Sequence, residues 1–266
     1  MVDKSEKFSW FVRLGFAARG ITYVLLGYIA LSTRTRAEGG GSAAFDWIQE
    51  VAFGRVILWV MVAGLIAYVA FRILCAIADI QNRGSDRAGV FKRVGDMASA
   101  VAHLFLAYAA YQFASGAKRR ADGDGGGSEL AGSVLQMELG PIVIGAIGLG
   151  FLAGAYTQGK TAWTLHFMHR ISSNAPKLTC QIGRAGHFAR AIVFAVIGWS
   201  MIEGAWLARE DRIKGLGAAI SALKETEAVY TLVAIGLVMF GLFTLVTARY
   251  RIIPDIGAEG LKPRFR

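Results

Sequence analysis

The sequence predicts an all-α integral membrane protein with six transmembrane helices, built as three helix-hairpin repeats. Hydrophobic residues make up 55% of the chain and the mean hydropathy is +0.45, which is too apolar for a soluble surface. The apolar residues gather in six runs of about 20 residues, the length that crosses roughly 30 Å of hydrocarbon. A short phrase that opens three of these runs indicates an internal repeat.

The six predicted spans follow one another along the chain, with charged residues near their ends. A soluble bundle is disfavoured, because buried helices seldom come as six such runs. The first run resembles a signal peptide, but its two relatives lie in mid-chain, so we interpret it as a retained helix. The spans are predicted at Leu14–Thr33, Val56–Ala78, Val94–Ser115, Gly140–Gln158, Ala185–Leu207 and Ala228–Ala248.

The repeated phrase reads RLGFAARGITYVLLGY from Arg13, RVGDMASAVAHLFLAY from Arg93 and RAGHFARAIVFAVIGW from Arg184. Aligned without gaps, the three copies share an arginine, then glycine, alanine and further small residues at fixed places. A fixed period of this kind marks a repeated structural unit. We divide the chain into hairpins at residues 1–83, 84–170 and 171–266, which together form one membrane domain.

Each unit continues with a Gly-rich loop and a short stretch in which apolar residues recur at helical spacing. This pattern predicts a short external amphipathic helix, the alternative being the outer end of the following span. Two spans per unit give every unit the same orientation. We therefore predict a pseudo-threefold arrangement about an axis along the membrane normal, with the odd-numbered spans nearer that axis.

Small residues recur every four positions in the fourth span. Such a row lets a neighbouring helix backbone approach closely in lipid. We predict a helix–helix contact at Ala146, Gly150 and Gly154.

The net charge of +10 is distributed by side rather than along a nucleic-acid face. One side, which includes both termini, holds 19 Lys and Arg against 7 Asp and Glu, whereas the other holds 10 against 12. Because cytoplasmic loops carry the excess of Lys and Arg, both termini are predicted to lie in the cytoplasm. The predicted location is the bacterial inner membrane, and the expected partners are membrane lipids, including anionic ones, and no nucleic acid.

The repeated R-x-G-x-x-A-R-G opening, the Gly-rich external loops and the final ARYR at Ala248–Arg251 resemble the bacterial family called domain of unknown function 1206. The resemblance covers nearly the whole chain and implies a multi-pass membrane protein of three helix hairpins. The middle unit departs from the pattern, because Ser99 replaces the second arginine of the phrase. The family name implies no function.

The arginines of the phrase are the first candidates for a binding site. In the first and third units the two arginines are six residues apart, about 9 Å along a helix axis. One interpretation places the second arginine as a depth anchor that snorkels to lipid phosphates. The other makes all five line a cytoplasmic vestibule for an anion or lipid headgroup: Arg13, Arg19, Arg93, Arg184 and Arg190.

A second candidate is an intramembrane polar site at His103, Tyr23 and Tyr108. His103 lies ten residues beyond Arg93, about 15 Å deep by helical rise. An ionisable residue at that depth suggests function, although a neutral histidine bonded to a neighbouring helix is the simpler interpretation. Asp96, three residues after Arg93, is expected to pair with it on the same helix.

No metal, haem or other cofactor is expected, because the four histidines lack matched depths and accompanying ligands. Phosphate-loop, nucleophile-elbow and zinc-helix motifs are absent from the sequence. The leading prediction is a non-enzymatic inner-membrane protein with a structural, envelope-related, partner-binding or lipid-binding role. A homo-oligomer or a membrane-protein partner is compatible with it. The alternative is a transporter or channel for a small molecule, ion or lipid, and a membrane enzyme is disfavoured.

The charge asymmetry makes a testable prediction about topology. Reporter domains fused at either terminus should report a cytoplasmic location, and reporters inserted at residues 39–41 should report the outer side. A reporter at residues 39–41 that is active in the cytoplasm would contradict this assignment.

Overall fold

A computed structural model of the chain describes residues 4–32, 40–117, 127–253, 255–256 and 263–264. Six of its helices are long and apolar enough to span a membrane. They are α1 (Lys4–Ser32), α3 (Gly54–Ile77), α4 (Arg87–Ser115), α6 (Gly140–Thr164), α7 (Thr179–Leu207) and α9 (Glu227–Tyr250). This confirms the predicted fold class, and α1, α4 and α7 begin earlier than the apolar runs indicated.

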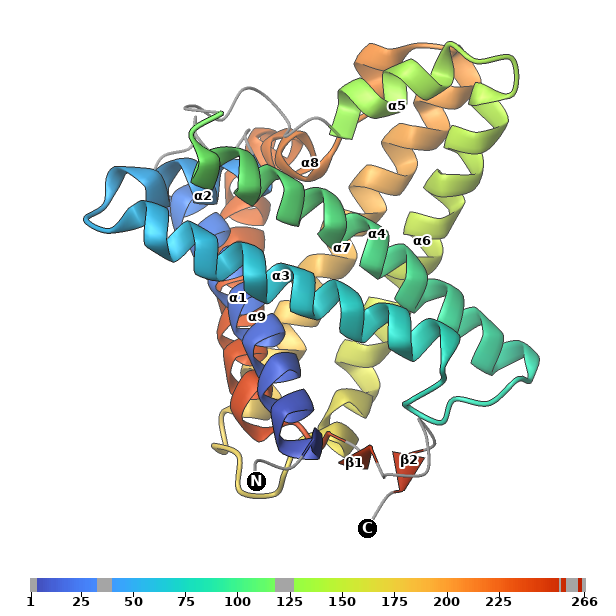
Figure 1. Cartoon of the computed structure of the whole chain (residues 1–266). Coiled ribbons are helices and arrows are strands. Elements are labelled where there is room, and N and C mark those ends of the chain that lie inside the picture. Colours follow the sequence, from blue (N-terminus) through green and yellow to red (C-terminus); the bar gives the residue numbers. More distant parts are fainter. Residues whose placement is uncertain (1–3, 33–39, 118–126, 254, 257–262, 265–266) are drawn as a thin grey trace.

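Short helices occupy one end of the bundle. They are α2 (Gly40–Glu50), α5 (Gly127–Leu135) and α8 (Leu216–Ala222), each between the two spans of a hairpin, as predicted. The start of α1 lies at the other end in Figure 1. The remaining elements are the 3-10 helices η2 (His166–Arg170), η3 (Glu210–Arg212) and η4 (Leu223–Glu225), and the paired strands β1 (Asp255–Ile256) and β2 (Pro263–Arg264). The predicted Gly-rich loops, at residues 37–44, 121–129 and 214–219, are shorter than expected, because α2, α5 and α8 begin within them. Residues 37–39 and 121–126 of these loops lie outside the described residues.

The strongest helix packing joins each hairpin to the next one. The second span of one hairpin packs on the first span of the following one in the pairs α3–α4 and α6–α7, and α9 packs on α1 in the same way. These three pairs run in cyclic order, which is the predicted pseudo-threefold relation. The first, third and fifth spans, which are α1, α4 and α7, were expected nearest the axis. Among the described residues they are not packed on one another into an inner ring, and each packs on an even-numbered span instead.

Two of the three hairpins are also packed internally, α1 on α3 and α7 on α9. The phrase glycine makes this contact in both. A methyl group on Gly15 would lie 2.7 Å from the backbone nitrogen of Tyr68, and one on Gly186 would lie 2.5 Å from the Cα of Phe240. Such a close approach of two backbones requires glycine.

The second hairpin is parted. Helices α4 and α6 are not among the packed pairs of the described residues. A methyl group on Gly95, the phrase glycine of α4, would have no neighbour within 4 Å. In Figure 1 the α3–α4 pair runs obliquely across the bundle, whereas α6 stays beside α7. The pseudo-threefold ring is therefore open at one place, between α4 and α6, which we call the α4–α6 opening.

The predicted contact at Ala146, Gly150 and Gly154 is largely wrong. Ala146 and Gly150 are exposed, and a methyl group on Gly150 would meet nothing within 4 Å. Only Gly154 has a neighbour, the ring of Phe194. The close approach of α6 to α7 uses Gly148 instead, where a methyl group would lie 2.9 Å from the carbonyl oxygen of Gly198. Helix α6 carries glycines on several faces, so spacing alone did not identify the contacting face.

Substitution of equivalent glycines by alanine should change the free energy of unfolding in opposite directions in the packed first hairpin and the parted second hairpin. A methyl group added at Gly64 of α3 would lie 2.6 Å from the Cβ atom of Ala18. Gly64→Ala should therefore lower the free energy of unfolding by about 1–3 kcal/mol. Gly150→Ala, at the equivalent place in α6, should raise it by roughly 0.5–1 kcal/mol, because only the helix preference of alanine acts there. Unfolding in mixed micelles of detergent and phosphatidylglycerol measures both. Equal losses at the two sites would show that α4 and α6 are packed.

Candidate functional site

The first arginines of the phrase lie at helix ends. Arg13 donates through Nη1 to the carbonyl oxygen of Ala248 at 2.8 Å and to that of Arg249, at the end of α9. Arg93 donates through Nε to the Ala76 oxygen at 2.7 Å and through Nη2 to the Ile77 oxygen at 3.1 Å, at the end of α3. Cations at these carbonyls complement the helix dipole.

Arg184 occupies the equivalent place in the third inter-hairpin pair. Its guanidinium carbon lies 5.7 Å from the ring centre of Trp163, in the last turn of α6. The first arginines of the phrase therefore serve three separate helix ends. The described residues do not bring them together into the expected ring around one mouth.

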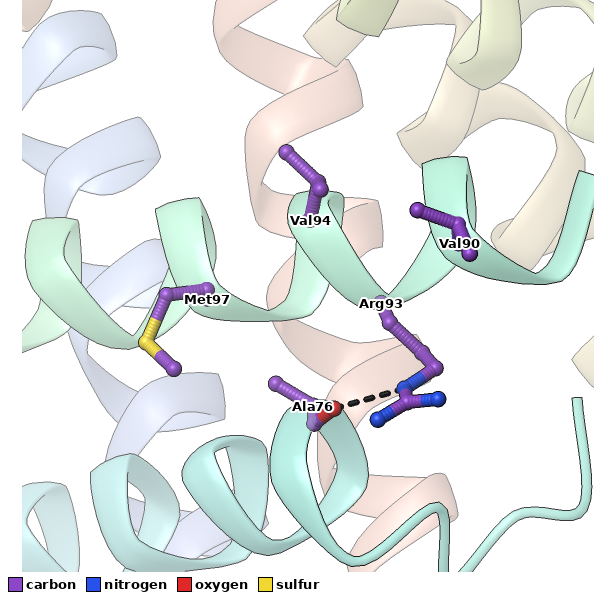
Figure 2. A pocket seen from close by; sticks show the side chains of 5 residues that line it. All are labelled: Ala76, Val90, Arg93, Val94 and Met97. Carbon is purple, nitrogen blue, oxygen red and sulfur yellow. Dashed lines mark hydrogen bonds between the residues drawn. The ribbon is translucent and has the colours of Figure 1, made fainter. Parts of the chain in front are cut away.

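Figure 2 shows the surroundings of Arg93, in a shallow groove of about 310 Å³ between the end of α3 and the start of α4. The other lining residues are apolar: Ala76, Val90, Val94 and Met97. The guanidinium donates to the carbonyls of Ala76 and Ile77, and it is the only polar side chain among the described residues that line this groove.

The second arginines, in contrast, meet in the interior. Arg19 of α1 and Arg190 of α7 are 6% and 8% exposed. Their guanidinium carbons lie 5.0 and 4.5 Å from the ring centre of Phe240, and both also lie over the ring of Tyr23. Two hairpins thus place two cations around shared aromatic rings. Burial inside the bundle disfavours the interpretation of both as snorkelling anchors.

Neither of these two arginines has a carboxylate partner among the described residues. Arg19 donates through Nη1 to the Tyr68 hydroxyl oxygen at 2.8 Å, and the described residues give the Arg190 side chain no hydrogen bond. The Nε atoms of both are buried and unpaired. Buried charges are normally paired, because desolvation of an ion costs several kcal/mol or more.

At the middle copy of the phrase the guanidinium comes from the first hairpin, from Arg72 of α3. Ser99 stands at the second arginine position of α4, and its Oγ accepts a hydrogen bond at 3.3 Å from Nε of Arg72 on α3. The Arg72 guanidinium carbon lies 5.4 Å from the centre of the Tyr68 ring. The Arg19 guanidinium carbon lies 5.0 Å from the centre of the same ring. We call Arg19, Arg72 and Arg190 the arginine core.

Asp96 neutralises part of this positive charge. It is 2% exposed and pairs with Arg72 and with Arg83, whose Nη1 lies 2.7 Å from Oδ2. The predicted pair with Arg93 on the same helix is wrong, since Arg93 is directed to the end of α3. In the next inter-hairpin pair the equivalent positions are His187 and Gln158, whose side chains are hydrogen-bonded.

The predicted intramembrane polar site is divided. His103 and Tyr23 are buried, and the His103 ring packs 4.6 Å from that of Tyr68. Nδ1 of His103 lies 2.8 Å from the Ser99 carbonyl oxygen, and its Nε2 is buried without a partner. Tyr108, by contrast, is 59% exposed and stacks on Tyr111.

Two further arginines were missed from the sequence, Arg170 at the end of η2 and Arg251 directly after α9. The Ser172 amide donates to the Tyr250 oxygen at 2.8 Å and the Ile252 amide to the Arg170 oxygen at 3.0 Å, which fixes Arg170 beside Arg251. Burial and the nearby charge of Arg170 lower the pKa of Arg251 to about 9. Burial, followed by the charge of Arg83, lowers the pKa of Arg170. The only hint in the sequence was the final ARYR.

Metal ligands are not grouped in the part of the chain that the structure describes, where no three His, Cys, Asp or Glu side chains come together. His166 and His169 stand with ring centres 5.2 Å apart at the surface. The side chain of His187, in the third hairpin, is hydrogen-bonded to Gln158. His103, in the second hairpin, lies beside the carbonyl oxygen of Ser99.

Comparison with known proteins agrees with the repeat. The family model "Domain of Unknown Function (DUF1206)" matches three times, at residues 14–79, 94–164 and 185–251. The chain belongs to the DUF1206 family. It is similar to a protein of Bacillus subtilis (strain 168) called "Uncharacterized protein YxxB", with 31% identity over 266 residues, 93% of this chain and 94% of the relative. No solved structure matches the chain.

The Asp96 ion pairs predict a large response to a small substitution. Asp96→Asn leaves two partly buried guanidinium groups without their carboxylate, so the free energy of unfolding should fall by about 1.5–3 kcal/mol. Asp211→Asn, which breaks an exposed pair with Arg209, is the matched control and should leave stability unchanged. Unfolding in detergent compares the two. A loss at Asp96 no larger than at Asp211 would contradict the pairing.

Proposed function

We propose that this DUF1206 protein is a non-enzymatic protein of the bacterial inner membrane whose arginine core binds the anionic headgroup of a lipid. Both termini face the cytoplasm in this proposal, as the charge asymmetry indicates. The observation that supports the binding role is the buried, uncompensated charge of Arg19 and Arg190.

Aromatic rings alone do not balance the cost of burying these cations. A cation over an aromatic ring gains roughly 0.5–2 kcal/mol, whereas an ion removed from water loses several kcal/mol. Asp96 is the only buried carboxylate among the described residues, and it is already ion-paired with Arg72 and Arg83. An external anion would supply the missing negative charge.

A phosphate-bearing headgroup suits these donors. Guanidinium groups present forked N–H donors that match phosphate oxygens, and the Nε atoms of Arg19 and Arg190 are available. Lipid phosphates are the anions that a transmembrane bundle meets at highest concentration. A catalytic role has less support, because no buried carboxylate of the described chain is free to act as a general acid or base.

Transport of the same anion is the second candidate, favoured by the parted helices α4 and α6. A protein that only binds the headgroup should not accelerate lipid movement between leaflets. Scrambling of a fluorescent phosphatidylglycerol in proteoliposomes tells the two functions apart. A homo-oligomer or a membrane-protein partner stays a prediction.

The headgroup site predicts selective loss of bound lipid. Arg19→Gln combined with Arg190→Gln should weaken phosphatidylglycerol binding by roughly tenfold or more, because each charge-assisted hydrogen bond contributes about 1.5–3 kcal/mol. Bound lipid is measured by mass spectrometry of the purified protein, and folding by its thermal transition.

The matched control is Arg13→Gln combined with Arg184→Gln, which removes the same charge from the helix ends. It should retain phosphatidylglycerol. If both double variants retain as much lipid as the unchanged protein, the core arginines do not bind headgroups.

A further inference from the structure

The second hairpin has the contact surfaces of a packed hairpin but does not use them. Gly95, Ala98 and Gly150 are exposed, whereas the residues at the same places in the other hairpins are buried. Those residues are Gly15, Ala18 and Gly64 in the first hairpin and Gly186, Ala189 and Gly236 in the third.

In the packed hairpins these residues touch one another. Gly64 of α3 faces Ala18 of α1, and Gly236 of α9 faces Ala189 of α7. The equivalent partners in the second hairpin are Gly150 and Ala98, and they stand apart. Elsewhere the exposed face of α4 carries large apolar residues such as Val101 and Leu104, as a lipid-facing helix should. Small residues at the contact positions therefore give α4 and α6 a surface on which they can pack.

One position of the second hairpin differs, and it lies beside the arginine core. Tyr68 and Phe240 cover Arg19 from two sides. The equivalent residue of the second hairpin is Gly154, which provides no ring. Phe194 of α7 takes the place that a side chain at Gly154 would fill, and the Arg190 guanidinium carbon is 4.7 Å from that ring centre. The core is therefore covered here by a ring of α7 and not by a side chain of α6, the helix that borders the α4–α6 opening.

We propose that α4 and α6 form a lateral gate, through which an acylated anion reaches the arginine core from the bilayer. The identity of the ligand rests on the headgroup binding proposed above. In the open state the headgroup lies at the core and the acyl chain lies between α4 and α6. Without such a lipid the two helices close through Ala98 and Gly150, in the manner of the other two hairpins.

Distances between spin labels on the two helices test the gate. Labels at Val101→Cys and Leu149→Cys, with Cys75 and Cys180 replaced by alanine, stand on exposed faces of α4 and α6. The equivalent residues Ile21 and Ala63 are also exposed although their hairpin is packed, so the labels do not obstruct closure. The pair Ile21→Cys and Ala63→Cys is the matched control and supplies the distance of a packed hairpin.

In phosphatidylcholine vesicles the Val101–Leu149 distance should mainly match the control distance, and phosphatidylglycerol should shift it to longer values. Gly150→Leu should abolish the short distance. A single long distance in both kinds of vesicle, or a short distance that survives Gly150→Leu, would overturn the gate. Inorganic phosphate added to phosphatidylcholine vesicles should produce no shift, and a full shift would identify a free anion as the occupant and overturn the acyl-chain assignment.

The gate and the headgroup site fail in different ways. A lipid-dependent distance change that persists in the Arg19→Gln, Arg190→Gln protein would leave the gate standing and remove the headgroup site. Phosphatidylglycerol retained through the arginines, with no change in distance, would do the reverse.

Discussion

Packing of each hairpin on the next is the interaction on which the rest of the structure depends. The pairs α3–α4, α6–α7 and α9–α1 place the phrase of one hairpin against the last turns of another. Arg13 and Arg93 bond the carbonyls of those turns, and Arg184 lies over Trp163 there. Because the same pairing occurs three times in cyclic order, the second arginine of the phrase is directed to the centre in two hairpins. One repeated helix contact thus builds the ring of helices and also buries Arg19 and Arg190 inside it.

Burial of that charge in a low-dielectric interior links the fold to function. Ion pairing with Asp96 satisfies Arg72, whereas Arg19 and Arg190 are left with aromatic rings and one tyrosine hydroxyl. A fold that merely needed apolar packing could fill these positions with leucine, as buried ion sites are rarely the most stable choice. The uncompensated arginines are therefore better explained by a bound anion than by stability. The opening beside them gives such an anion a route from the bilayer.

The sequence predicted the membrane class, the six spans, the short external helices and the cyclic repeat, because hydrophobic run length and a fixed period are one-dimensional signals. Side-chain partners were harder to predict. Asp96 has a partner at helical spacing, Arg93, yet bonds Arg72 and Arg83, which only the α3–α4 pairing brings near. Gly150 belonged to a plausible small-residue row, but Gly148 makes the contact. Arg170 and Arg251 meet only through tertiary structure.

The central claim is that the arginine core holds a lipid phosphate while α4 and α6 stand apart. An experimental structure in nanodiscs that contain phosphatidylglycerol measures this most directly. The account predicts phosphate density within hydrogen-bond distance of Nε of Arg19 and Arg190, continuous with an acyl chain between α4 and α6. Density for protein alone, with α4 packed on α6 and both arginines satisfied by protein groups, would contradict it.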